Sequence, residues 1–319
     1  MIRTVLAVAL TLWAVASPAS AQPYPSRPIK FVVPFAAGSA TDTLARLLGD
    51  HAAKTLRTQV VVENMAGGSG VIAAQAVARA APDGYTVLIA TNTTHAANQS
   101  LLKQMPYDAV NDFEPVSKIG TIVLALIAHP SVPAKNVRDL VAYAKANPGK
   151  LSFGAGSSSS RLAGEMLKSL AGIDIVHVAY RSNPQAITDI LGGHIQLVFA
   201  DLSTTLPQIK DGKVTGLGVS SAQRTPLAPD LPTMVEAGVP GYELTAWFAA
   251  FAPAKTPKPI VDQIRSALHA ALADKATTDR MLAAGIEAEK SSPEELKAFV
   301  ISETKKWADI VKAAGIQPE

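Results

Sequence analysis

The chain has 319 residues, with 29 Lys and Arg against 26 Asp and Glu, a formal net charge of +3 and no cysteine. This near-neutral balance, without a run of five basic residues, gives no support for nucleic-acid binding. The absence of cysteine excludes disulfides, thiolate catalysis and cysteine-ligated zinc. We therefore expect a large hydrophobic core, in one large domain or two of ordinary size.

The first 21 residues have the layout of a secretory signal peptide. One cation, Arg3, precedes an apolar segment over 5–15, and the small-x-small tripeptide Ala19-Ser20-Ala21 follows. A membrane anchor is the alternative, but the apolar segment is shorter than the roughly 18–20 residues that span a bilayer. We expect cleavage after Ala21 and export of a product that does not itself span the membrane.

Beyond residue 21, short β-branched segments alternate with helical patterns. The expected strands are 29–35, 59–64, 85–91, 150–155, 173–180, 195–200 and 214–220. This alternation is typical of parallel α/β sheets with right-handed crossovers. Two longer extended segments, 113–130 and 242–257, have little helical periodicity. We expect them to cross between two lobes.

Several helix starts are marked by an N-cap residue with an acidic residue three positions later. The pairs are Ser39–Asp42, Asn136–Asp139 and Ser292–Glu295. Another helix is expected to open at Asn183-Pro184, because proline is favoured in the first turn. The tail that follows Ser292 is expected to form one long amphipathic helix.

Two loops join a strand to a helix through small residues. In "VVPFAAGSATD" (32–42) a strand ends in small side chains just before a capped helix. The unpaired N–H groups and the helix dipole of such a place can bind a carboxylate or phosphate without a cationic side chain. An ordinary turn is the alternative for this loop alone. However, "SFGAGSSSSR" (152–161) repeats the arrangement, so two loops could hold one anion between them.

Other chemistry has little support in the sequence. The turn within 63–78 partly matches a dinucleotide fingerprint, but the next strand ends without the required acid. No closely spaced histidine pair indicates zinc, and His95 alone follows a strand end where ligands bind in open sheets. The serine run at 157–160 lacks a Gly-x-Ser-x-Gly elbow, which leaves an exported serine hydrolase as a remote alternative. We expect no enzyme activity, no metal and no cofactor.

Ordered motifs run from the first strand to the last helix. They include "YPSRPIKFVVPFAAGSATD" (24–42), "PYDAVNDFEPVS" (106–117), "RLAGEMLKSLAGIDIVHVAY" (161–180), "DILGGHIQLVFAD" (189–201) and "LPTMVEAGVPGYELTAWF" (231–248). On these motifs the chain resembles the receptors of tripartite tricarboxylate transporters, the Bug family. The resemblance implies an α/β, two-lobed periplasmic binding protein fold, type II-like. Each lobe would be a mostly parallel sheet flanked by helices, with two strands crossing between lobe 1 (22–121 and 250–319) and lobe 2 (122–249).

The resemblance also implies a function and a site. The chain would be a monomeric solute-binding protein that closes by hinge motion on a small organic carboxylate and delivers it to a two-subunit membrane permease. A ligand-dependent partner of a periplasmic sensor domain is the alternative. The ligand-binding residues indicated by the two loops and the resemblance are Phe35, Gly38, Ser39, Ala40, Thr41, Asp42, Thr93, His95, Ser157, Ser158, Ser159, Arg161, Tyr180, Arg181, Asp201 and Trp247, with Phe248 beside the last.

The sequence departs from the family pattern around this site. Ala37-Gly38-Ser39 stands where the family commonly has Pro-Gly-Gly, and Arg161 stands where a histidine is frequent. These changes indicate a ligand unlike that of a generic member. Arg161 and Arg181 could each offer a planar fork to a distal carboxylate, although arginines mostly point into solvent. The hypothesis is that at least one of them pairs with that group, so that the ligand is a dicarboxylate.

Overall fold

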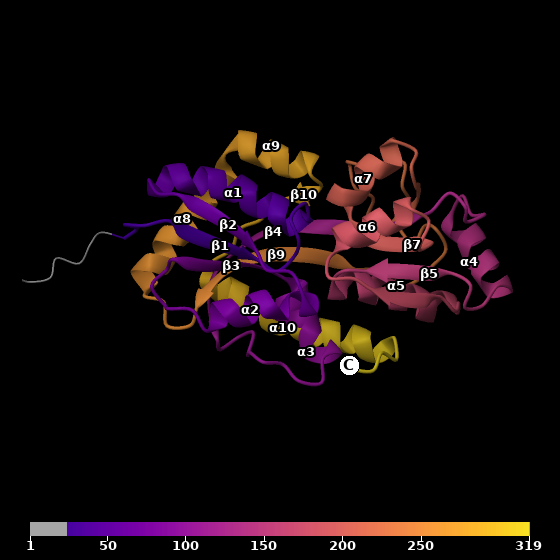
Figure 1. Cartoon of the computed structure of the whole chain (residues 1–319), viewed down its shortest axis with the longest axis horizontal. Helices are drawn as coiled ribbons and strands as arrows, with labels where there is room; N and C mark the ends of the chain where they lie inside the picture. The colour runs from indigo at the N-terminus through magenta and orange to yellow at the C-terminus, as the bar shows by residue number, and fades with distance from the viewer. Residues whose placement is uncertain (1–23, 319) are drawn as a thin grey trace, which may run out of the picture.

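The strands form a curled sheet in the order β2-β1-β3-β9-β4-β7-β5-β6, and β8 and β10 also pair with β4. This arrangement is seen in the computed structural model, which describes residues 24–318 (Figure 1). The expected signal peptide, residues 1–21, lies outside the described residues. No helix within 24–318 is both long and apolar enough to cross a membrane.

The first lobe combines about the first third of the chain with its C-terminal helices (Figure 1). Strands β1 (Ile29–Val33), β2 (Val60–Asn64) and β3 (Thr86–Thr91) are parallel. Between and after them come α1 (Ala40–Leu56), η1 (Gly68–Gly70), α2 (Val71–Ala78), the π-helix η2 (Thr93–Ala97) and α3 (Asn98–Leu101). The C-terminal elements are α8 (Lys258–Ala273), α9 (Lys275–Ala283), β10 (Ile286–Glu287) and α10 (Pro293–Ala313).

The second lobe is built from the middle of the chain. Strands β5 (Ser152–Ala155), β6 (Val176–Ala179) and β7 (Leu197–Asp201) are parallel, whereas β8 (Thr215–Val219) pairs antiparallel with β4. Its helices are α4 (Val137–Ala146), α5 (Ser158–Ala171), α6 (Asn183–Leu191) and α7 (Leu202–Lys210). The strand–helix alternation expected from the sequence is confirmed.

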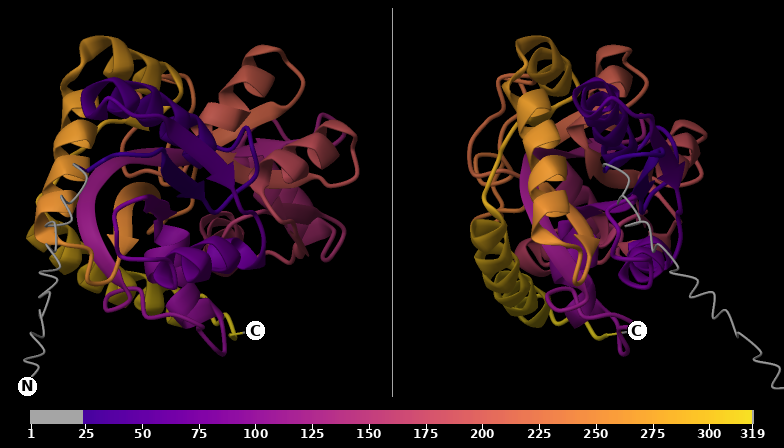
Figure 2. Two further views of the ribbon diagram at one scale, coloured as in Figure 1. Left: turned by 60° about the vertical axis from the view of Figure 1, so that its left-hand side comes forward. Right: turned by 90° about the vertical axis from the view of Figure 1, so that its left-hand side faces the viewer.

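Two antiparallel strands, β4 (Phe113–Ala128) and β9 (Thr245–Pro253), connect the lobes. They pair from Phe113–Pro253 to Val123–Thr245, and β4 then continues into the second lobe beside β7. The register shifts twice along β4, and such bulges bend a strand, which accounts for the curvature of β4 in Figure 2. The two expected crossing segments are thus confirmed, while the lobe boundaries at 121/122 and 249/250 stay a prediction.

The predicted helix starts are also confirmed. The side chains of three N-cap residues accept a hydrogen bond from the amide three residues later, as a cap should. These bonds are Asp42 N to Ser39 (3.2 Å), Asp139 N to Asn136 (2.9 Å) and Glu295 N to Ser292 (3.1 Å). The tail is one helix, α10, whose buried face includes Leu296, Trp307 and Val311.

Candidate functional site: a cavity between the lobes

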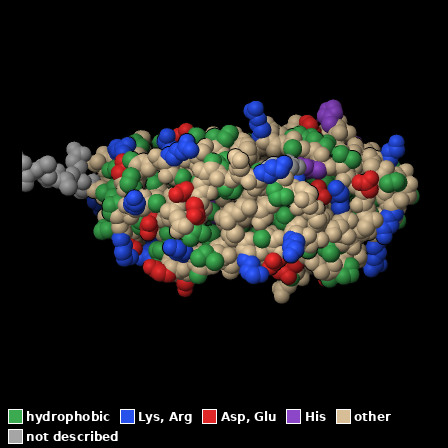
Figure 3. Space-filling view, turned by 90° about the horizontal axis from the view of Figure 1, so that it is seen from below, with side chains coloured by type: hydrophobic (Ala, Val, Ile, Leu, Met, Phe, Trp, Pro, Cys, Tyr) green, Lys and Arg blue, Asp and Glu red, His purple; other side chains and the backbone are tan. Residues whose placement is uncertain are grey.

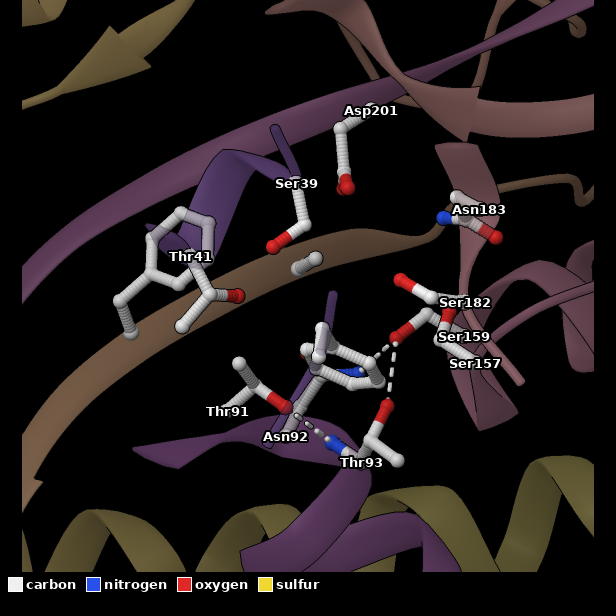
Figure 4. A pocket seen from close by; sticks show the side chains of 13 residues that line it. Ser39, Thr41, Thr91, Asn92, Thr93, Ser157, Ser159, Ser182, Asn183 and Asp201 are labelled. Carbon is white, nitrogen blue, oxygen red and sulfur yellow. Dashed lines mark hydrogen bonds between the residues drawn. The ribbon is translucent and has the colours of Figure 1, made fainter. Parts of the chain in front are cut away.

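A cavity lies between the two lobes, where strands of both sheets end (Figure 4). Most of its lining side chains are small and polar, and two aromatic rings complete it. The lining residues are Phe35, Ser39, Thr41, Thr91, Asn92, Thr93, Ser157, Ser159, Ser182, Asn183, Asp201, Ala246 and Phe248. No Lys, Arg or His belongs to this lining among the described residues.

Five of the lining residues are N-caps. In each case a parallel strand ends and a helix begins, so the chain turns at the cavity. These residues are Ser39 for α1, Asn92 for η2, Ser157 for α5, Ser182 for α6 and Asp201 for α7. Helix N-termini present unpaired N–H groups and a partial positive charge. The convergence of several N-termini can therefore attract an anion without a formal cation.

In the first lobe, an acidic side chain fixes the loop between β1 and α1. Asp42 accepts hydrogen bonds from Gly38 N (3.0 Å) and Arg46 Nε (3.1 Å), and Asn64 Nδ2 donates to it (3.0 Å) and to Phe35 O (2.9 Å). Burial by itself would raise the pKa of Asp42, but the hydrogen bonds from Arg46, Gly38 and Asn64 lower it. Asp42 thus shapes the loop from behind and does not line the cavity.

The loop uses most of its own amides. Gly38 N donates to Asp42, Ser39 N to Ala36 O (3.1 Å) and Asp42 N to Ser39 Oγ. The amides of Ala40 and Thr41 belong to the first turn of α1, where an N–H has no partner within the helix. They are the amides of this loop best placed to meet a ligand.

In the second lobe, Gly156 brings two helix starts together. A Cβ at this position would overlap the main chain of Ser182 and Asn183, so only glycine allows the α5 and α6 loops to approach this closely. The side-chain oxygen of Asn183 accepts hydrogen bonds from Gly156 N (3.0 Å) and Ser160 Oγ (2.9 Å). The N-termini of α5 and α6 therefore form one rigid wall of the cavity.

The two lobes touch directly around the cavity. Hydrogen bonds join residues that are far apart in the sequence, three of them between side chains and one from a main-chain N–H, and two of them appear as dashed lines in Figure 4. They are Asn92 Nδ2 to Ser159 Oγ (2.7 Å), Thr93 Oγ1 with Ser159 Oγ (3.3 Å), Ser158 Oγ to Asn98 Oδ1 (2.6 Å) and Ala36 N to Ser182 Oγ (3.2 Å). The structure therefore has the lobes in a closed arrangement.

Asp201 is the acidic residue of the lining. Its side chain points into the cavity, opposite Ser39 (Figure 4). Burial raises the pKa of the Asp201 carboxyl to about 6, and the side-chain amide of Asn183 opposes part of this shift.

The residues indicated by the sequence divide into two groups. Those in the cavity lining are Phe35, Ser39, Thr41, Thr93, Ser157, Ser159 and Asp201, together with Phe248. Those outside the lining are Gly38, Ala40, Asp42, His95, Ser158, Arg161, Tyr180, Arg181 and Trp247. Arg161 is partly buried in the first turn of α5, and Arg181 is exposed before α6.

Three residues outside the lining have other contacts. Successive side chains of β9 point to opposite faces of the sheet, so Phe248 faces the cavity and Trp247 faces away from it. The Trp247 indole N–H donates to Glu303 Oε2 (2.9 Å) instead. The ring of His95 is buried against that of Phe251, 4.1 Å between centroids, and burial lowers its pKa to about 3. Tyr180 donates its hydroxyl to Asp189 (2.6 Å).

Five lining residues are not among the ligand-binding residues expected from the sequence: Thr91, Asn92, Ser182, Asn183 and Ala246. A signal existed for four of them, since ligands of open α/β sheets bind beyond the carboxyl ends of strands. Thr91 and Asn92 end β3, and Ser182 and Asn183 start α6 after β6. Ala246 is the second residue of the hydrophobic strand β9, and nothing in its sequence context indicates that it lines the cavity.

The described residues do not support a metal site or a broad charged surface on the face drawn in Figure 3. Within 24–318 no three His, Asp or Glu side chains are grouped so that they could hold a metal ion. On the face drawn in Figure 3, basic and acidic side chains are interspersed. That face offers no broad surface of one charge to a polyanion.

Comparisons with known proteins identify the family. The sequence profile of the tripartite tricarboxylate transporter family receptor matches residues 44–316. The solved structure of the periplasmic binding protein BugD is 37% identical, with a TM-score of 0.89, over 93% of this chain and 100% of that one. R. palustris Rpa4515 with adipate is 35% identical, with a TM-score of 0.90, over 93% and 100% of the two chains.

A third solved structure extends the comparison. MatC from Rhodopseudomonas palustris with bound malate is 31% identical, with a TM-score of 0.86, over 90% of this chain and 100% of that one. The two-lobed fold and the family expected from the sequence are thereby confirmed. The chain belongs to the tripartite tricarboxylate transporter receptors, a family of periplasmic solute-binding proteins and not of enzymes.

Proposed function

We propose that this receptor encloses a small organic dicarboxylate between its lobes and delivers it to a two-subunit membrane permease. The observation that carries the proposal is the convergence of N-capped helix starts on a cavity lined without Lys, Arg or His. Neutral N–H and O–H groups then hold the anion, and small side chains let it approach the backbone. Such an arrangement binds a carboxylate without a buried cation that would need its own partner.

The dicarboxylate class is supported by the relatives. Adipate, seen with Rpa4515, and malate, seen with MatC, each carry two carboxylates. In this chain, donors are available on both walls: the α1 start in the first lobe, and Ser157, Ser159 and Ser182 in the second. A carboxylate at each end of the ligand would thus meet its own set of donors. The pairing of a distal carboxylate with Arg161 or Arg181 stays a prediction, which would need a side chain to turn toward the cavity.

Binding can be tested with the mature protein and a panel of carboxylates in a thermal-shift assay. A ligand at 100 times its dissociation constant should stabilise the protein by about 2.7 kcal/mol. Adipate and malate should stabilise more than hexanoate and 3-hydroxybutyrate, their matched monoacids. Equal affinities for diacid and monoacid would overturn the dicarboxylate class, and no effect of any carboxylate would overturn the receptor function.

Delivery needs a separate test in cells. Uptake of the stabilising acid should be lost both when this receptor is deleted and when the two permease subunits are deleted. Uptake that persists without the permease would instead favour the sensor-partner alternative.

A further inference from the structure

The carboxylate of Asp201 is not required by the helix that it begins. Asp201 is the N-cap of α7, yet its side chain accepts no capping hydrogen bond. Its main-chain oxygen accepts a bond from the Thr204 hydroxyl (2.8 Å) instead. Figure 4 shows the carboxylate directed into the cavity, between Ser39 and Asn183. An acidic side chain is therefore held in the ligand space without a structural task that the helix imposes.

This carboxylate has little compensation from its surroundings. No basic residue of the described chain lines the cavity. The donors to the partly buried carboxylate are the Asn183 side chain and the main-chain N–H of Asp201 itself, and removing a carboxylate from water without a cation is costly. Asn183 can offer only its NH2 group, since its side-chain oxygen already accepts from Gly156 and Ser160. A ligand that brings a donor to this position would satisfy Asp201, whereas a second carboxylate there would be repelled.

We propose that Asp201 selects, among small dicarboxylates, those that carry a hydroxyl or ammonium group next to one carboxylate. The inference rests on the proposed function, and it adds a specificity-determining residue. In this arrangement the ligand carboxylate lies at the starts of α1 and α5, while the neighbouring hydroxyl or ammonium group donates to Asp201. Ser39 and Asp201 both line the same small cavity, so one end of a short ligand reaches both.

The test is calorimetry with matched ligand sets of increasing length. Each set has a plain diacid, its 2-hydroxy analogue and its 2-amino analogue: succinate, malate and aspartate, then glutarate, 2-hydroxyglutarate and glutamate, then adipate, 2-hydroxyadipate and 2-aminoadipate. At the chain length that fits, the substituted acid should bind about ten- to a hundredfold more tightly, the range expected for a hydrogen bond to a charged group. The hydroxy and amino members show which donor the site prefers.

The decisive variant is Asp201→Asn, which keeps the shape and removes the charge. The plain diacid should bind it more tightly than the wild type, because the repulsion is gone, and the amino acid more weakly, because its ionic partner is gone. The hydroxy acid should change least, since an amide oxygen still accepts. Asp211→Asn, at the other end of α7 and paired on the surface with Lys213, is the matched control and should leave all affinities unchanged.

The opposed changes of plain and amino diacids distinguish selection from a loss of fold, which would weaken every ligand together. Equal affinities within every set, in wild type and variant, would overturn the selectivity of Asp201 and leave the proposed receptor function standing. Failure of all the diacids to bind the wild type would overturn the proposed function, and this inference with it.

Discussion

The two loops that face each other across the cavity each contain a glycine, for different reasons. Gly38 has φ +80, and nothing lies within 4 Å of the place where its Cβ would be. Gly156 has no positive φ, but the main chain of Ser182 and Asn183 fills the space of its Cβ. The first loop thus needs glycine for its left-handed backbone conformation. The second needs glycine because there is no space for a Cβ atom. A similar run of small residues in the sequence hides two different physical constraints.

The loops also differ in what supports them. The first is fixed mainly within its own lobe by Asp42 with Arg46 and Asn64, and it reaches the second lobe through one bond, from Ala36 N to Ser182 Oγ. The second places Ser158 and Ser159 against side chains of the first lobe. We infer that the first loop is preformed, whereas the contacts of the second exist only when the lobes are closed.

The largest effect is expected for Gly156→Ala. The added methyl group must displace main chain, and overpacking of this kind typically costs about 1–3 kcal/mol or more. The free energy of unfolding from denaturant titration measures this loss, and ligand affinity should fall as well because the α6 start moves. A larger residue, as in Gly156→Asn, should be worse than alanine. A variant as stable as the wild type would show that the α5 and α6 loops separate easily.

The second-largest loss of stability is expected for Asp42→Ala, because this change removes the acceptor for Gly38, Arg46 and Asn64 at once. Hydrogen bonds to charged groups contribute about 1.5–3 kcal/mol, so a loss of about 2 kcal/mol is expected. Ligand affinity should fall too, since the loop loses its fixed shape. Asp230→Ala, at an exposed acidic residue of the second lobe, is the matched control and should change neither property.

The same carboxylate predicts a dependence on pH. The pKa of Asp42 is lower in the folded protein than the ordinary value of 3.8. The ionised carboxylate therefore makes its full contribution to the free energy of unfolding at pH values above 3.8. It is lost as the pH falls through the folded-state pKa. Acid should therefore narrow the stability difference between wild type and Asp42→Asn. Parallel stability curves between neutral pH and acid would contradict this role.

These contrasts also show how far sequence analysis reaches. Caps such as Ser39 are local signals, so the sequence predicts the first residues of these helices correctly. The face of the sheet to which a strand residue points is not encoded in its neighbouring residues. Trp247 and Phe248 are adjacent aromatic residues, and only the packing of the whole sheet determines that Phe248 lines the cavity. Likewise, Trp247 is held by Glu303, 56 residues away, and the sequence offers no pattern that pairs them.

Gly38→Ala should have a smaller effect than either change above. A residue with a side chain at this left-handed φ costs roughly 1–2 kcal/mol, with no added clash. Asparagine tolerates this conformation better, so Gly38→Asn should recover part of the stability. At Gly38 the alanine variant should therefore be less stable than the asparagine variant, whereas at Gly156 it should be more stable. This difference distinguishes backbone strain at Gly38 from lack of space at Gly156. The same order at both positions would mean that one constraint governs both loops.

The smallest effect is expected for Ser159→Ala, which tests whether the second loop depends on closure. The change removes the bond from Asn92 (2.7 Å) and the contact with Thr93, both of which join the lobes. A typical hydrogen bond contributes about 1 kcal/mol, so ligand affinity should fall roughly fivefold, while unfolding of either lobe should change little. Small-angle scattering of the ligand-free protein should give a larger radius of gyration for the variant, because the open state gains population.

Ser169→Ala, exposed on the same helix, is the control and should leave the ligand affinity and the radius of gyration unchanged. If Ser159→Ala leaves both unchanged, the contacts between the lobes do not stabilise the closed state, and the second loop is as preformed as the first.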